Sequence, residues 1–292
     1  MNIGLGTASF GTSISPERSF EIMDAFVRTG GRVMDTANNY AFWNGAGGES
    51  ETVIGQWLQN IERSKVEIHT KIGYQPIEAG NPSTFEGLSK ESIERALEKS
   101  LSRLQTDYVD VLYAHVDDTS TSLEETWTTF TTVINEGYAK KLGISNYRAP
   151  RIRELCAVIT ANDLAPISYA QYRYTIIEPK EDADFGVQVC FTQPVRKVIA
   201  SLGGDVIIVA YSPLLDGTFE PDNQLPDNYQ TEENDLAVER LRSEASSLSV
   251  SPSALVLRRI ADQGIMPLTM TGKLSHLESN LSLFSGDVET KH

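Results

Sequence analysis

Short apolar runs alternate with amphipathic helical patterns along the whole of this chain. Eight runs predict strands, at residues 3–8, 32–35, 66–71, 108–115, 141–145, 167–171, 206–211 and 265–269. Several are continuously apolar, which is typical of parallel strands buried on both faces. Eight strands alternating with helices predict an α/β fold, a single (β/α)₈ barrel domain over residues 1–292.

The helix ends follow known capping rules. Serine stands at the expected start of four helices, at Ser15, Ser89, Ser122 and Ser251. Proline follows two of these serines, at Pro16 and Pro252, and is well tolerated in the first helical turn. Glycine ends three of the predicted helices, at Gly30, Gly137 and Gly264.

Two long polar segments, residues 75–88 and 215–234, interrupt this rhythm. Both follow predicted strands, so both belong to the face of the barrel where loops shape a pocket. The alternative interpretation of these two segments is a disordered insertion.

The glycines of Gly4-Leu5-Gly6 lie within the first strand rather than in a turn before a helix, so they do not indicate a dinucleotide-binding turn.

Charge and cysteine content exclude several classes of partner. The formal net charge is −15, which disfavours nucleic acid and anionic membranes. Neither Cys156 nor Cys190 has metal-ligand spacing around it, so no metal site is expected and both thiols are expected to be reduced. The first residues resemble no signal peptide and no run is long enough to span a membrane, which favours a cytoplasmic protein.

Four residues with acid–base chemistry gather at predicted strand ends: Asp35, Tyr40, Lys71 and His115. The C-terminal strand ends of such a barrel meet on one face, where active sites form. An ammonium beside a phenol lowers the pKa of the phenol, so Lys71, held by Asp35, is expected to make Tyr40 a better acid. His115 can orient a carbonyl oxygen beside Tyr40.

This arrangement can protonate a developing alkoxide, but no side chain can deliver hydride. A nicotinamide cofactor is therefore implied. Taken singly, each residue has a plainer interpretation: an acid capping a turn, a packed tyrosine, a structural ion pair and a buried histidine. Only the combination, in this order and at these positions, favours catalysis.

Several motifs resemble the aldo-keto reductase superfamily. The matching segments are GLGTASFG, MDTANNY, HTKIG, YAH, KKLGISNY, AYSPL and MTGKLSHLESN. They are ordered along nearly the whole chain. The resemblance implies an NAD(P)H-dependent carbonyl reductase on a (β/α)₈ barrel, with Tyr40 as general acid, Lys71 and Asp35 tuning it, and His115 orienting the carbonyl.

The resemblance also implies a cofactor site. Its expected residues are Gly6, Thr7, Ser145, Asn146, Gln171, Tyr211, Ser212, Leu214, Thr271, Lys273, His276 and Asn280. Within this set, Ser145, Asn146 and Gln171 are expected at the carboxamide and Tyr211 against the ring. A helix beginning just after Lys273 is expected to add a positive N-terminus near phosphate.

Three departures from the family pattern stand out. The chain begins directly in its first strand, so the short N-terminal hairpin of many members is expected to be absent. Only residues 281–292 follow Asn280, so Phe42 and Trp43 are expected to line the substrate pocket in place of a long C-terminal loop. His276 stands where many NADP-specific members carry an arginine. NADPH is expected as the cofactor, with NADH as the alternative. The preference for NADPH is expected to be weaker than in relatives that carry arginine at this position.

The substrate stays open at this level. The leading hypothesis is reduction of an aldehyde or ketone. The same residues also suit the reverse reaction, that of an NAD(P)-dependent sugar dehydrogenase, in which Tyr40 acts as base. A cofactor-binding regulatory subunit with little turnover is a further alternative. Neither the substrate, the physiological direction nor the oligomeric state follows from the residues.

Overall fold

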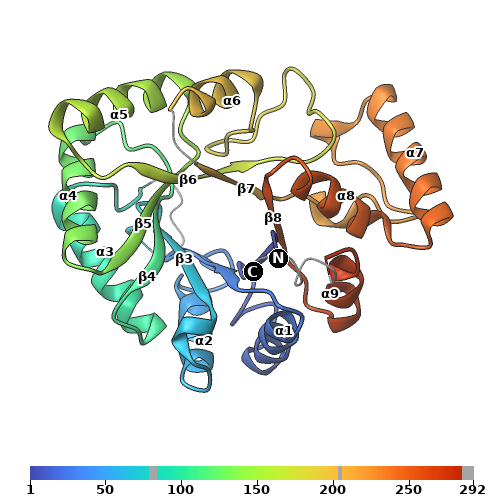
Figure 1. Ribbon diagram of the computed structural model, residues 1–292, viewed down its shortest axis with the longest axis horizontal. Coiled ribbons are helices and arrows are strands. Elements are labelled where there is room, and N and C mark those ends of the chain that lie inside the picture. Colours follow the sequence, from blue (N-terminus) through green and yellow to red (C-terminus); the bar gives the residue numbers. More distant parts are fainter. Residues whose placement is uncertain (79–83, 203–205, 285–292) are drawn as a thin grey trace, which may run out of the picture.

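Eight parallel strands close into a barrel in the computed structural model, which describes residues 1–78, 84–202 and 206–284 (Figure 1). The strands are β1 (Gly4–Gly6), β2 (Val33–Asp35), β3 (Glu67–Ile72), β4 (Val109–Ala114), β5 (Ala139–Ser145), β6 (Ile167–Arg173), β7 (Ile207–Tyr211) and β8 (Met266–Thr269). Each pairs with the next, and β1 pairs with β8. The predicted (β/α)₈ barrel is confirmed.

The helices lie outside the barrel (Figure 1). They are α1 (Pro16–Arg28), α2 (Glu49–Leu58), α3 (Lys90–Leu104), α4 (Leu123–Asn135), α5 (Ala149–Asn162), α6 (Gln193–Ala200), α7 (Glu232–Leu248), α8 (Pro252–Ala261) and α9 (Leu274–Leu281). Short 3₁₀ turns form η1 (Arg63–Lys65), η2 (Leu215–Gly217) and η3 (Asp227–Tyr229). The predicted serine caps are confirmed, since each of the four accepts a hydrogen bond from a backbone N–H three residues later. None of the described helices is long and apolar enough to cross a membrane.

Two apolar layers hold the strands in place. The barrel interior is filled by Val33, Val111, Tyr113, Tyr169, Val209, Met266 and Leu268. A larger layer lies between the strands and the surrounding helices. His69 is fully buried in the barrel, where its Nδ1 lies 3.4 Å from the Tyr113 hydroxyl. Bulky interior residues make the barrel a packed core, and the space for a ligand lies at its end.

The segment 215–234 is ordered around η2 and η3 and contributes Leu215, Asp216 and Gly217 to a cavity wall. This supports the pocket-shaping interpretation over a disordered insertion. The segment 75–88 is described at its two ends, where Pro76 pairs with Phe85; residues 79–83 lie outside the described residues. Gly4 and Gly6 belong to β1, as expected, rather than to a turn that cradles phosphate.

Helices α2 and α3 come unusually close at Gly55. A Cβ added there would lie 2.8 Å from the Leu104 carbonyl carbon and closer still to the Arg103 carbonyl oxygen. Backbone cannot move aside as a flexible side chain can, so we expect Gly55→Ala to lower the free energy of unfolding by about 1–3 kcal/mol. Urea titration measures this change. Gln56→Ala, at the exposed neighbouring position, is the control, and equal stabilities for the two variants would contradict the close approach.

Candidate active site

The structure brings the four predicted catalytic residues together at the C-terminal face of the barrel. Asp35 is the last residue of β2, and Lys71 is the penultimate residue of β3. His115 directly follows β4, and Tyr40 lies on the loop after β2. Parallel neighbouring strands place these ends side by side, which is why residues distant in sequence meet here.

Lys71 is the centre of this cluster. It is fully buried, and its Nζ donates to Asp35 Oδ2 at 2.7 Å, to the Thr36 carbonyl at 2.7 Å and to Tyr40 Oη at 3.0 Å. An ammonium has three N–H donors, so every one has a partner. Burial lowers the pKa of Lys71, and the Asp35 carboxylate opposes that shift. The pair therefore holds a buried charge in one fixed place.

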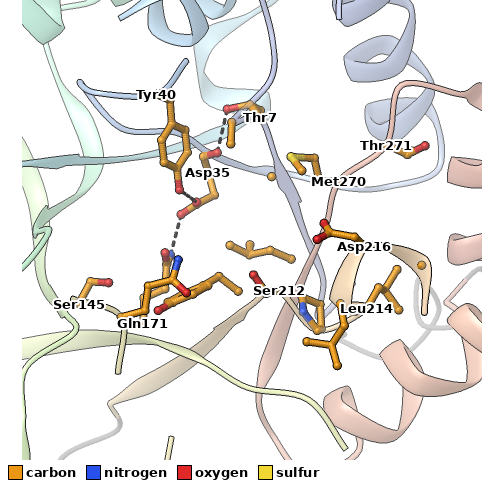
Figure 2. Close-up of a pocket in the computed structure, with 18 of the residues that line it drawn as sticks. Thr7, Asp35, Tyr40, Ser145, Gln171, Ser212, Leu214, Asp216, Met270 and Thr271 are labelled. Atoms are coloured by element: carbon orange, nitrogen blue, oxygen red, sulfur yellow. Dashed lines mark hydrogen bonds between the residues drawn. The ribbon is translucent and has the colours of Figure 1, made fainter. Parts of the chain in front are cut away.

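The pKa of Tyr40 was expected to be lowered, and its surroundings raise it instead. Its hydroxyl lies 3.5 Å from Asp35 Oδ2 (Figure 2). Burial and the Asp35 carboxylate raise the pKa of Tyr40 well above its usual value of 10. The reason is that removal of water and a nearby negative charge both disfavour a phenolate, and they outweigh Lys71. Tyr40 is therefore protonated at neutral pH, which is the state in which it can donate a proton.

His115 completes the cluster of predicted catalytic residues. Its ring packs against Tyr40 with centroids 6.1 Å apart and against Tyr74 at 5.8 Å. Burial and the charge of Lys71 lower the pKa of His115 well below 6.5. The imidazole is therefore neutral at neutral pH. Its Nδ1 is buried and has no hydrogen-bond partner in the described structure.

A second buried carboxylate, which the sequence did not single out, lies behind the cluster. Glu51, in the first turn of α2, is fully buried. It accepts hydrogen bonds from Thr70 Oγ1 at 2.5 Å and from Arg103 Nε at 2.8 Å. Thr70 precedes Lys71, so Glu51 ties this part of β3 to α2 and α3. An acid in the first turn is ordinary for a helix, so sequence alone gave no reason to select it.

One elongated cavity of about 1190 Å³ opens above the cluster. It extends from Tyr40 and His115 past the end of β7 to the N-terminal end of α8 and to α9. Among the predicted residues, its walls include Asp35, Tyr40, His115, Gly6, Thr7, Ser145, Asn146, Gln171, Tyr211, Ser212, Leu214, Thr271, His276, Asn280, Phe42 and Trp43. Lys71 lies buried beneath the wall. Lys273 is exposed and is not among the described residues that line the cavity.

The amide side chains of the cavity have different freedom to bind a ligand. Gln171 Nε2 donates to Asp35 Oδ1 at 2.7 Å (Figure 2). Asn146 uses both of its N–H donors, toward the His115 carbonyl and Ser145 Oγ. Its Oδ1 accepts from the Val189 N–H and from the Tyr211 hydroxyl at 2.8 Å.

An amide has two donors and two acceptor positions, so Asn146 is fully satisfied. It can reach a ligand only by breaking one of these bonds. The structure instead gives Asn146 the task of fixing Tyr211 and the end of β4. The carbonyl oxygen of Gln171 is the group that can accept from a ligand amide.

The cavity wall fits a nicotinamide dinucleotide. The Tyr211 ring supplies a flat surface, and Ser145 and Gln171 supply polar groups beside it. The helix α9 begins at Leu274, directly after Lys273 as predicted, so its positive N-terminal end lies near the far part of the cavity. These cofactor contacts stay predictions.

Aromatic side chains surround the catalytic end of the cavity. Trp43 is half exposed and lies with its ring centroid 6.4 Å from Tyr40 and 5.4 Å from Phe42. Tyr74 stacks on Phe85 at 3.8 Å. Tyr74 and the loop at 185–188 were not selected from the sequence. The connection between β6 and α6 is long, so its length was the signal that could have marked it.

Backbone strain accompanies this site. Ala41, Asn146 and Ser212 all have positive φ, at 74°, 62° and 52°. Non-glycine residues rarely adopt this conformation, and such strain concentrates at functional sites. Each of the three lies in the wall or next to a residue of the wall, which is independent support for the location of the site.

The barrel and this site define an α/β-barrel protein with an acid–base cluster at the C-terminal ends of its strands. The model of the aldo/keto reductase family matches residues 2–291, and the chain belongs to this family. It is 39% identical over 166 residues to an aryl-alcohol dehydrogenase of Pestalotiopsis microspora, covering 56% of this chain and 42% of that protein.

Other relatives agree with this assignment. An uncharacterised oxidoreductase of Bacillus subtilis is 32% identical over 217 residues, which cover 73% of this chain and 62% of that protein. The chain thus spans less than two thirds of the length of these relatives. The crystal structure of a thermostable aldo-keto reductase with the inhibitor epalrestat superimposes with a TM-score of 0.72 at 23% identity, covering 100% of this chain and 92% of that one. That likeness supports the fold.

Proposed function

We propose that this chain is an NAD(P)H-dependent oxidoreductase that reduces aldehydes or ketones to alcohols, with Tyr40 as general acid. The observation that carries the proposal is the contact of Lys71 Nζ with both Asp35 and Tyr40 at the floor of the large cavity. The cofactor, when bound, supplies the hydride. The residues of this chain place the protons and hold the oxygen of the substrate.

Each residue of the cluster has a distinct role in the proposal. Tyr40 donates its proton to the oxygen of the carbonyl as negative charge develops there. Lys71 lies 3.0 Å from that hydroxyl and stabilises the phenolate that remains. Asp35 keeps the ammonium in position. Neutral His115 shares the cavity wall with Tyr40 and holds the carbonyl oxygen beside it.

Aromatic aldehydes are the substrate class we favour within this proposal. Phe42, Trp43 and Tyr74 form apolar walls around the reacting end of the cavity. Flat aromatic substrates can stack on such walls. Relatives of this chain are named aryl-alcohol dehydrogenases, which agrees with that class.

The unpaired thiols of Cys156 and Cys190 fit the reducing cytoplasm that the sequence favours.

The oxidative alternative, a sugar dehydrogenase, needs Tyr40 as a base. The same Tyr40 hydroxyl serves both directions, so its pKa does not select one of them; the apolar walls of Phe42, Trp43 and Tyr74 favour an aromatic substrate over a sugar. A regulatory subunit without turnover has no specific observation in its favour.

The direct test is turnover. Purified protein is mixed with NADH or NADPH and a panel of aromatic aldehydes, aliphatic aldehydes and sugars, and the loss of dihydronicotinamide absorbance is followed. We expect consumption that depends on the carbonyl. Tight cofactor binding without consumption across the panel would favour the regulatory alternative instead.

The pKa directions predict how the two reaction directions depend on pH. Between about pH 6 and 8, His115 stays neutral and Tyr40 stays protonated, so kcat for reduction is expected to be flat. At higher pH the rate falls as Lys71 loses its proton, earlier than an ordinary lysine does because its pKa is lowered. Alcohol oxidation rises with pH, since it needs the phenolate. A reduction rate that follows an imidazole titration near about pH 6.5 would contradict these assignments.

A further inference from the structure

The family resemblance implies that the far end of the cavity holds the adenosine of the cofactor. NADH and NADPH differ only in a 2′-phosphate on this adenosine, so the residues at this end would decide between them. This end is lined on one side by Met270, Thr271 and His276, after β8. The segment after β7 lines the cavity with Asp216 and Glu220. Figure 2 shows the Asp216 carboxylate between Leu214 and Met270, with Thr271 further along the same wall as Met270.

The segment that carries the two carboxylates is firmly held. Arg242 of α7 donates to the carbonyls of Thr218, Phe219, Glu220 and Asn223. Glu220 Oε1 also accepts from the Ser253 hydroxyl at 2.5 Å and from the Ser253 backbone N–H at 3.2 Å. The Glu220 carboxylate is thus fixed in the wall, and the exposed Asp216 side chain adds a second negative charge to the lining of the same cavity.

Met270 occupies a position with direct access to this end of the cavity. It is 44% exposed, directly follows β8 and lines the cavity with an apolar thioether. Next to it, Thr271 Oγ1 accepts from the Lys273 backbone N–H at 3.1 Å and donates to the Lys273 carbonyl at 3.5 Å, so it offers a phosphate one neutral hydroxyl. The Lys273 side chain is exposed, and no lysine or arginine is among the described residues that line the cavity.

A 2′-phosphate is a doubly charged group that is best held by cationic donors. Here it would meet a thioether, one hydroxyl and the N-terminal end of α9, with no lysine or arginine among the described lining residues and with two carboxylates in the same lining, in a protein of formal net charge −15. A ribose 2′-hydroxyl is neutral and can donate to a carboxylate, which is how acidic residues select NAD over NADP in other folds.

We propose that this cavity binds NADH in preference to NADPH, with Met270 as the residue that withholds a cation from the 2′-phosphate. This inference rests on the proposed function, and it reverses the order of preference that the C-terminal motif favours.

The experiment measures binding rather than turnover. The dissociation constants of NAD⁺ and NADP⁺ are obtained at about pH 8 from quenching of tryptophan fluorescence, since Trp43 lies half exposed in the same cavity. The variants are Met270→Lys and, as a matched neutral control, Met270→Leu. Circular dichroism checks that both variants fold.

We expect wild type to bind NAD⁺ more tightly than NADP⁺. Met270→Lys should shift the ratio of the two constants toward NADP⁺ by about tenfold or more, and Met270→Leu should leave it unchanged. Tighter binding of NADP⁺ by wild type, or an unshifted ratio in Met270→Lys, would overturn the inference while the proposed function stands. Failure of both nucleotides to bind would instead contradict the proposed function.

Discussion

Replacing Tyr40 with phenylalanine is expected to lower kcat for carbonyl reduction by about 10²–10⁴-fold, the range typical of a lost general acid. Only the hydroxyl is removed, and the ring keeps its packing against Trp43 and His115. The affinity for the cofactor should change little, because the proposed role of Tyr40 lies in the chemical step. Steady-state kinetics with saturating cofactor, together with a fluorescence measurement of cofactor affinity, separates the two effects.

Tyr138→Phe is the matched control. Tyr138 is exposed at the start of β5 and loses the same hydroxyl without touching the cavity, so its kcat should equal that of wild type. If Tyr40→Phe retained more than half of the wild-type kcat, another group would have to be the acid.

Lys71→Met is expected to damage both catalysis and stability. Methionine fills similar space but leaves the Asp35 carboxylate buried without its cation, and breaking a buried ion pair in this way costs about 3–5 kcal/mol. The remaining folded protein should show a greatly reduced kcat, because Tyr40 loses the charge that stabilises its phenolate. Urea unfolding and kinetics at saturating substrate measure the two losses separately.

The control for Lys71→Met is Lys140→Met. Lys140 also forms an ion pair with a carboxylate, Asp110, at 2.9 Å, but its side chain is 57% exposed. Exposed pairs contribute about 0–1 kcal/mol, so this variant should be nearly as stable as wild type and fully active. Equal destabilisation by the two substitutions would mean that the buried Lys71–Asp35 pair contributes no more to the free energy of unfolding than the exposed Lys140–Asp110 pair.

The sequence predicted the barrel because periodicity and capping are local signals. A continuous apolar run such as the one before His115 identifies a strand buried on both faces, and Ser251-Pro252 identifies the start of a helix, without knowledge of the partners. The meeting of Asp35, Lys71 and His115 was also predictable, because strand order in a barrel determines which strand ends meet. Asp35 and Lys71 could be paired from their strand positions before any distance was known.

Properties that depend on surroundings could not be predicted. The direction of the Tyr40 pKa is set by how much water is excluded and by the nearness of Asp35 relative to Lys71. The saturation of Asn146 depends on Val189 and Tyr211, which lie far from it in sequence. The burial of Glu51 against Arg103 arises from the packing of α2 on α3. A residue's type and spacing carry none of this information.

The acidic wall around Asp216 illustrates the same limit at the cofactor site. The motif after β8 favours a phosphate site on its own residues, whereas the structure leaves Lys273 out of the described cavity lining and places Asp216 and Met270 in the lining of one cavity. A segment after β7 therefore changes the expected preference of a segment after β8, and only tertiary structure shows that the two line one cavity.

The central claim is direct hydride transfer to a carbonyl carbon in this cavity, and isotope transfer tests it most directly. The enzyme is supplied with NADH or NADPH carrying deuterium at both C4 positions and with an aromatic aldehyde, and the alcohol is analysed by mass spectrometry. One deuterium is expected on the carbinol carbon of the product, and Tyr40→Phe is expected to form at least about 10²-fold less of this labelled alcohol than wild type over the same interval. An alcohol whose new C–H hydrogen comes from solvent, or an aldehyde left unreduced by wild type with either cofactor, would contradict it.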